Sequence, residues 1–265
     1  MTEFLYEVNS AWIAVGLFAT MVAAVELGHR IGAARAPSTS EASKEHIQGI
    51  QATFLGILAL LLGFTLSLAL QRFDSRSEAV VDEANAIGTA YLRADLLPEG
   101  LRGEGRRLIG GYVDLRVRAS DLSAVEHAER QRLGEAQSRA QAALWALARR
   151  GVEADPNAYV PTLFAEAVNA LVDSQGRREA ALQRHVPEVV LVLLGATLLM
   201  SGWVVGYAAG VAGHRPSMVG YLMVLLIVVT VFMVLDLDRP RRGLILVSQQ
   251  SMLDLQAGIR AAAPR

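Results

Sequence analysis

The run MVGYLMVLLIVVTVFMVL, residues Met218–Leu235, contains no charged side chain. A bilayer core of about 30 Å is crossed by about 20 apolar residues in a helix, with a lower limit of about 17. Three further apolar blocks of comparable length lie at Ala11–Leu27, Phe54–Leu70 and Val186–Ala212. Buried helices of a large soluble protein are an alternative, but four of them in 265 residues would be unusual. The pattern predicts an integral membrane protein with four transmembrane helices.

The composition excludes several classes of protein. Apolar residues make up 52% of the chain and charged residues only 19%, below the roughly 25% that is usual in soluble domains. The 25 basic and 26 acidic residues give a net charge of -1, so no nucleic-acid partner is expected. Cysteine is absent, and the five histidines are scattered. With no P-loop and no G-x-S-x-G motif either, we expect no enzyme, no cofactor and no metal site.

The four apolar blocks predict an all-α fold with four transmembrane helices in two pairs. Residues 28–47, which include the turn sequence PSTS at 37–40, are expected to link the first pair. Residues 213–217 are expected to form a tight hairpin in the second pair. The predicted domains are a first transmembrane pair at 1–70, a polar helical bundle at 71–185, a second transmembrane pair at 186–237 and a polar C-terminal tail at 238–265.

The polar insert between the second and third spans is expected to form four helices. It is rich in strong helix formers, and its apolar residues recur at spacings of three and four. The first helix should continue out of the second span, because Gly88 is the only glycine or proline in residues 71–96. The last should run straight into the third span as far as Pro187, which should kink or restart the helix. The residues expected on the apolar stripes include Val80, Val81, Ile87, Leu92, Ile109, Tyr112, Leu144, Leu147, Phe164 and Leu171.

Basic residues near the predicted membrane ends give conflicting indications of orientation. Arg30, Arg35 and Lys44 in the first loop favour a cytoplasmic loop and an external insert. A larger set of arginines lies at the span ends next to the polar insert and the C-terminal tail, and it favours a cytoplasmic insert. That set comprises Arg72, Arg76, Arg177, Arg178, Arg184, Arg239, Arg241 and Arg242. Charge alone leaves both orientations open.

Two clusters of polar residues are candidate functional sites. Asp82, Glu83 and Asn85 follow the second span, and they could form a solvated bundle face or a polar ring around an axial conduit. Asp236, Asp238, Arg239 and Arg241 follow the fourth span. The second cluster could be an interfacial stop with Asp–Arg pairs, an ion vestibule or a latch between subunits.

The second span carries Gly56, Leu60 and Phe64 on one helical face, because they are spaced by four residues. Ser67 and Gln71 share a face further along the same helix. A line of small and polar residues on one side of an apolar helix is compatible with helix–helix contact or with a pore wall.

The sequence LLGF at 61–64, followed by Arg72-Phe73, resembles the second helix of bestrophin channels. The runs EANAIG at 83–88 and LDLDRP at 235–240 resemble the bacterial bestrophin-like domain family more closely. Bestrophins are pentameric ion channels with four spans per subunit, a helical cytosolic region and an apolar neck on the second helix. In this chain Gly56 stands where a large apolar residue would narrow the pore, and Asp74 stands where a second aromatic residue is usual.

The resemblance implies a homo-oligomer, a pentamer if it is bestrophin-like, in the bacterial inner membrane with a cytoplasmic insert. Its partners would be the lipid bilayer, further copies of itself and inorganic ions. The function expected from it is passive conduction through a neck formed by Gly56, Leu60 and Phe64. The alternative is a non-conducting membrane scaffold or sensor that binds a partner through its helical bundle.

Overall fold

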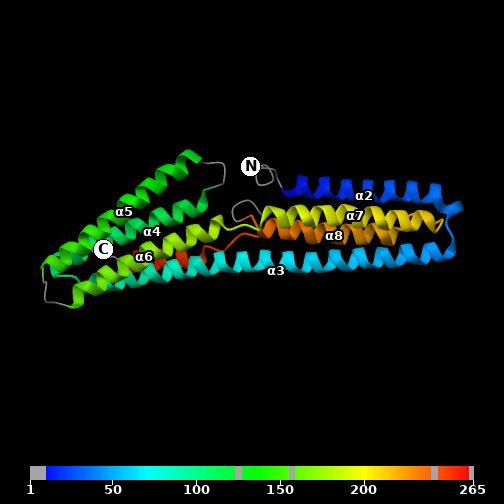
Figure 1. Ribbon diagram of the computed structural model, residues 1–265. Coiled ribbons are helices and arrows are strands. Elements are labelled where there is room, and N and C mark those ends of the chain that lie inside the picture. The colour runs from blue at the N-terminus through cyan, green and yellow to red at the C-terminus, as the bar shows by residue number, and fades with distance from the viewer. Residues whose placement is uncertain (1–9, 123–126, 155–158, 240–243, 263–265) are drawn as a thin grey trace. The chain divides into compact units, whose positions relative to one another are not determined.

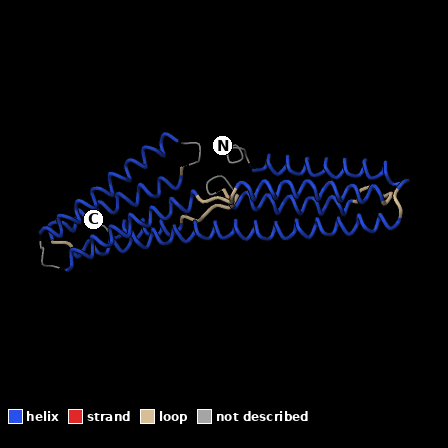
Figure 2. The backbone as a smooth tube through the Cα atoms, viewed as in Figure 1, coloured by secondary structure: helices blue, strands red, loops and turns tan. Residues whose placement is uncertain are grey.

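The computed structural model describes residues 10–122, 127–154, 159–239 and 244–262. Within these ranges the chain forms helices joined by short turns and loops, and it contains no strand (Figure 2). The all-α prediction is therefore confirmed. Four helices in the described part of the chain are long and apolar enough to cross a membrane. They lie within Trp12–Ser38, Glu41–Leu96, Pro161–Val211 and Met218–Leu237.

The chain divides into two compact units, Met1–Arg72 with His185–Ile245 and Phe73–Arg184 with Leu246–Arg265. The first unit contains α2 (Ser10–Arg35), η1 (Ala36–Ser38), the first part of α3 (Glu41–Arg93), α7 (Glu188–Val211) and α8 (Met218–Leu237). Its helices lie side by side in Figure 1. They enclose a core of apolar side chains, among them Met21, Val25, Leu58, Leu62, Leu194, Leu198, Val224 and Val228.

Glycines bring α2 and α7 into backbone contact. A Cβ added at Gly28 or Gly32 of α2 would overlap the carbonyl oxygen of Trp203 or Tyr207 on α7. In return, a Cβ at Gly206 would overlap the Val25 carbonyl oxygen, and one at Gly210 would overlap that of His29. Because small residues four positions apart let two helices approach closely, these glycines form the helix–helix contact surface typical of membrane proteins.

The prediction of a linker over residues 28–47 is wrong. Helix α2 continues to Arg35, and α3 already begins at Glu41, so only η1 and two further residues separate the two helices. Gly28 and Gly32, which lie within the expected linker, are part of α2 and contact the backbone of α7. The Thr39 and Ser38 hydroxyls donate to the Arg35 carbonyl oxygen and help to end α2 there.

The second unit contains the remainder of α3, η2 (Ala94–Leu96), α4 (Glu99–Asp121), α5 (His127–Ala154), α6 (Tyr159–Gln183) and α9 (Gln250–Ala262). The predicted continuity of the second span into the insert is confirmed, because α3 is unbroken from Glu41 to Arg93. Helix α7 restarts at Glu188 directly behind Pro187, as expected, but α6 already ends at Gln183 and does not run on to the proline.

The apolar stripes of the second unit pack into one core. Its fully buried members come from every helix of the unit, and they include Ile87, Leu97, Ile109, Tyr112, Leu144, Phe164, Leu171 and Met252. Val81 and Leu92, which were expected on the stripe of α3, are exposed instead. The residues expected as a polar C-terminal tail contain α9, which buries Met252 and Ile259 in this core.

Candidate functional site

The three predicted neck residues lie on an exposed face of α3 in the first unit. Leu60 and Phe64 are 59% and 66% exposed, and a Cβ added at Gly56 would meet no atom within 4 Å. The opposite face of the same helix carries the buried side chains of Leu58 and Leu62. No described part of the chain therefore covers the face that carries Gly56, Leu60 and Phe64.

This face of α3 changes its chemical character along the helix. Spacings of three and four residues continue it through Ser67, Gln71, Asp74, Glu78, Asp82 and Asn85, all of them fully or largely exposed. The sequence of side chains is apolar, then neutral and polar, then acidic. Lipid is a poor environment for Ser67 and Gln71 on an apolar span, so the polar part of the face suits water or protein contact.

The structure separates the predicted cluster of Asp82, Glu83 and Asn85. Asp82 and Asn85 are exposed on the face of α3 just described, whereas Glu83 is fully buried in the second unit. Glu83 therefore cannot contribute to a polar ring on that face. Its carboxylate instead holds two arginines from other helices.

Arg116 of α4 binds both carboxylate oxygens of Glu83, with Nε to Oε1 at 2.5 Å and Nη2 to Oε2 at 3.0 Å. Arg178 of α6 donates from Nη1 to Oε2 at 2.6 Å. The remaining guanidinium donors reach Gln137 of α5 and Gln249, which lies just before α9, at 3.0 and 2.6 Å. Buried charges are tolerated when they are paired and hydrogen-bonded, and this network links α3, α4, α5 and α6 to the residue that precedes α9.

The surroundings of this network raise the pKa values of Tyr112 and Arg116. Burial raises the pKa of Tyr112 to about 12, although the neighbouring Arg116 partly opposes the rise, so the phenol is neutral at physiological pH. Burial alone would lower the pKa of Arg116. The hydrogen bonds and the charge of Glu83 outweigh burial, and the pKa of Arg116 lies above its ordinary value.

The cluster after the fourth span is buried at the end of α8. Asp236 and Asp238 are each 1% exposed and Arg239 is 4% exposed, while Arg241 lies outside the described residues. Asp236 Oδ2 accepts from the Ile245 backbone N–H at 2.9 Å. Its Oδ1 has no hydrogen-bond partner among the described residues.

Asp238 ties the chain at the start of α7 to the end of α8. Its Oδ1 accepts from the Val186 N–H at 3.0 Å, and its Oδ2 lies 3.5 Å from His185 Nδ1. These contacts lie within the first unit. The carboxylate thus satisfies the Val186 backbone donor at a break between helices, where intrahelical acceptors are missing.

Two features of the structure were missed from the sequence. One is the pair of arginines, Arg116 and Arg178, that neutralise Glu83; no local pattern marks them, because they lie 33 and 95 residues away. The other is the glycine contact between α2 and α7. Its signal was present as glycines spaced by four, at 28 and 32 and again at 202, 206 and 210.

The described chain combines four helices that are long and apolar enough to cross a membrane with a polar helical unit, which indicates a membrane protein. Among the described residues no group of three potential metal ligands occurs. The model of the Bestrophin-like domain family matches residues 12–252, so the chain belongs to that family. Comparisons with curated proteins and with solved structures gave no significant match.

Proposed function

We propose that the chain is one subunit of a homo-oligomeric, passive ion channel of the bacterial inner membrane. Its four spans form two pairs, with the helical polar bundle inserted between the second and third spans. The observation that carries the proposal is the exposed face of α3, which is apolar at Gly56, Leu60 and Phe64 and polar at Ser67 and Gln71. Arranged around a symmetry axis, as in the pentamers that the chain resembles, this face would line a pore.

The proposed neck works by excluding water. Rings of Leu60 and Phe64 would form an apolar constriction, which gates ions by dewetting when it is narrow. Beyond it, the face carries the exposed carboxylates of Asp74, Glu78 and Asp82. Rings of acidic side chains attract cations and repel anions, so we infer a preference for cations.

Gly56 favours a second candidate function, a non-conducting membrane scaffold or sensor that binds a partner through its helical bundle. A Cβ at this position would meet no atom within 4 Å, so the glycine leaves space where a neck should be narrowest. In that case α3 would pack against a neighbouring subunit without enclosing water.

Cysteine accessibility distinguishes the two functions, because the native chain contains no cysteine. Ser67→Cys places a thiol on the proposed pore wall, and Leu226→Cys places one on the 67% exposed, apolar side of α8. A channel predicts that a membrane-impermeant, charged thiol reagent modifies Ser67→Cys in liposomes but not Leu226→Cys. Protection of both positions in an intact oligomer would favour the scaffold.

The proposed orientation places the helical insert in the cytoplasm. Its support is the set of arginines at the membrane ends together with the family membership. A topology reporter fused after the exposed residue Ala154 should be active in the cytoplasm. Activity restricted to the periplasm would reverse the orientation.

A further inference from the structure

The exposed apolar face of α8 ends at an acidic residue. Leu222, Leu226, Val229 and Met233 recur at spacings of three and four residues, so they share one face of the helix, and each is between 43% and 67% exposed. Asp236 follows three positions later on the same face, yet it is only 1% exposed. Because a carboxylate on the lipid-facing side of a membrane span is costly, its burial here needs a cover.

The loop that follows α8 contributes to this cover. The backbone N–H of Ile245 donates to Asp236 Oδ2 at 2.9 Å, so this part of the loop lies level with the last turn of α8. The same arrangement leaves apolar side chains in the open, because Leu244 is 83% exposed and Ile245 is 37% exposed. The loop therefore binds the acid through its backbone and replaces it at the surface with two apolar side chains.

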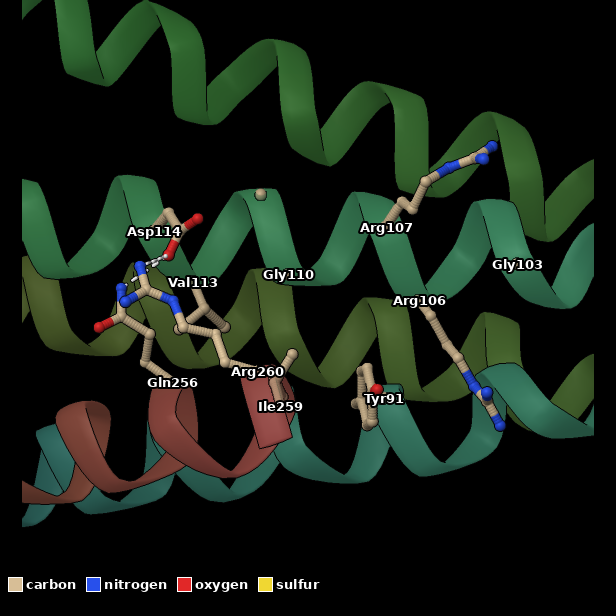
Figure 3. A pocket seen from close by; sticks show the side chains of 11 residues that line it. Tyr91, Gly103, Arg106, Arg107, Gly110, Val113, Asp114, Gln256, Ile259 and Arg260 are labelled. Atoms are coloured by element: carbon tan, nitrogen blue, oxygen red, sulfur yellow. Dashed lines mark hydrogen bonds and ion pairs between the residues drawn. The ribbon is translucent and has the colours of Figure 1, made fainter. Parts of the chain in front are cut away.

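Contacts of α9 hold the chain that continues from this loop. Within the second unit, Asp114 Oδ1 accepts from Gln256 Nε2 at 2.6 Å and from Arg260 Nη2 at 2.9 Å (Figure 3). Helix α9 begins at Gln250, only five positions after Ile245. The exposed apolar residues thus belong to a short connection that is held on both sides, and not to a free tail.

The level of the loop beside α8 indicates what it meets. The last turn of a membrane-spanning helix lies near the boundary between acyl chains and headgroups, where apolar side chains bind by burying their surface in the bilayer. Leu244 and Ile245 follow the exposed face of α8 at that boundary. The face that we propose for pore lining lies on another helix, α3, so lipid is the partner that fits this loop.

We propose that Leu244 and Ile245 form an interfacial anchor, which inserts into the bilayer boundary at a depth set by the bond between Ile245 and Asp236. The anchor requires that α8 crosses the membrane. It does not require ion conduction, and it applies equally to a channel and to a scaffold.

The test is fluorescence quenching in phosphatidylcholine liposomes, and the absence of native cysteine allows one labelled position at a time. The variant Leu244→Cys carries an environment-sensitive fluorophore. The liposomes contain lipids with a nitroxide quencher either near the headgroup or near the end of the acyl chain. We expect the shallow quencher to act about twofold or more strongly than the deep one at position 244.

Two exposed leucines serve as matched controls. The label at Leu226→Cys, on the same face in the middle of α8 and 67% exposed, should be quenched more strongly by the deep nitroxide. The label at Leu92→Cys in the second unit, 71% exposed, should respond to neither lipid and should be quenched by aqueous iodide. If the Leu226 label is not quenched by the deep nitroxide, α8 does not cross the membrane and the basis of the proposal fails.

The Leu244 label can contradict the anchor in two ways. Quenching by iodide alone would place the loop in water, and protection from iodide and from both lipids would show that protein, such as a second copy, covers it. Asp236→Ala removes the acceptor of the Ile245 N–H and should weaken shallow quenching at position 244 while leaving the Leu226 label unchanged. Unchanged quenching at position 244 in an intact oligomer of this variant would overturn the role of Asp236.

Discussion

Glu83 and Arg116 form a bidentate ion pair in the interior of the second unit, with N–O distances of 2.5 and 3.0 Å. Glu83 is fully buried and also holds Arg178. Two arginines thus share one carboxylate, and removing that carboxylate would leave two buried positive charges without a counter-charge. The ion pair makes the packing of α4 and α6 depend on a single residue of α3, the helix that carries the proposed pore face.

Glu83→Gln should destabilise the protein by about 3–5 kcal/mol, because breaking a buried ion pair leaves uncompensated charge. The matched control is Asp82→Asn, which removes a carboxylate from the exposed side of the same helix and should change stability by less than about 0.5 kcal/mol. Denaturant unfolding followed by circular dichroism measures both. Equal stability of the two variants would show that the buried network is not needed for stability.

The raised pKa of Tyr112 predicts a loss of stability at alkaline pH. The folded-state value of about 12 lies above the unfolded value of 10.0, so the folded protein holds this proton more tightly. The stabilisation that the protonated Tyr112 gives the folded state is fully present below pH 10 and is lost as the pH rises toward 12. Tyr112→Phe should therefore show a smaller decrease in melting temperature than the native protein between these pH values. Equal decreases in the melting temperatures of the native protein and Tyr112→Phe would contradict the raised pKa of Tyr112.

The contact between α2 and α7 should not tolerate a side chain at Gly206. Gly206→Leu would drive atoms into the Val25 backbone and should cost about 3 kcal/mol or more. Gly195→Leu on the same helix is the control, because a Cβ there would meet no atom within 4 Å. Thermal unfolding in detergent should give Gly206→Leu a lower melting temperature than Gly195→Leu, and Gly206→Ala an intermediate one. Native-like stability of Gly206→Leu would refute close backbone contact.

Asp238→Ala should lower the stability of the first unit, since it removes the acceptor for the Val186 N–H and the carboxylate next to His185, although the Asp238 backbone oxygen, 3.1 Å from His185 Nδ1, remains. A hydrogen bond to a charged group contributes about 1.5–3 kcal/mol. Asp238→Asn retains an acceptor and should be less affected. Melting temperature, oligomer mass and ion flux are the measurements. If none of them changes in Asp238→Ala, the cluster after α8 serves only to end the span.

The sequence was sufficient to predict the elements whose signals are local. Four charge-poor blocks predicted four membrane-spanning helices, and a stretch without proline predicted the continuity of α3. The linker prediction was wrong because Gly28 and Gly32 continue helix α2. Their contact with α7, which is distant in sequence, stabilises the helix there. Helix α9 was not predicted, although Met252, Leu255 and Ile259 recur at the helical spacings of three and four residues.

The candidate site could be predicted only in part, for a related reason. Leu58, Leu60, Leu62 and Phe64 are all apolar, so composition alone does not indicate which of them face outward. Helical spacing grouped Leu60 with Phe64, and the structure leaves both exposed. Glu83 and Asp82 are adjacent acids with similar local contexts, yet only Glu83 has arginine partners, and these come from distant helices.

The central claim is that the exposed face of α3 lines a pore, and ion flux tests it most directly. The purified protein and the double variant Leu60→Ala with Phe64→Ala are reconstituted in liposomes, and potassium efflux is measured beside oligomer mass. Smaller side chains widen and wet an apolar neck, so the account predicts faster efflux through an intact oligomer of the variant. Unchanged efflux through an intact oligomer, or loss of the oligomer, would contradict it and favour the scaffold.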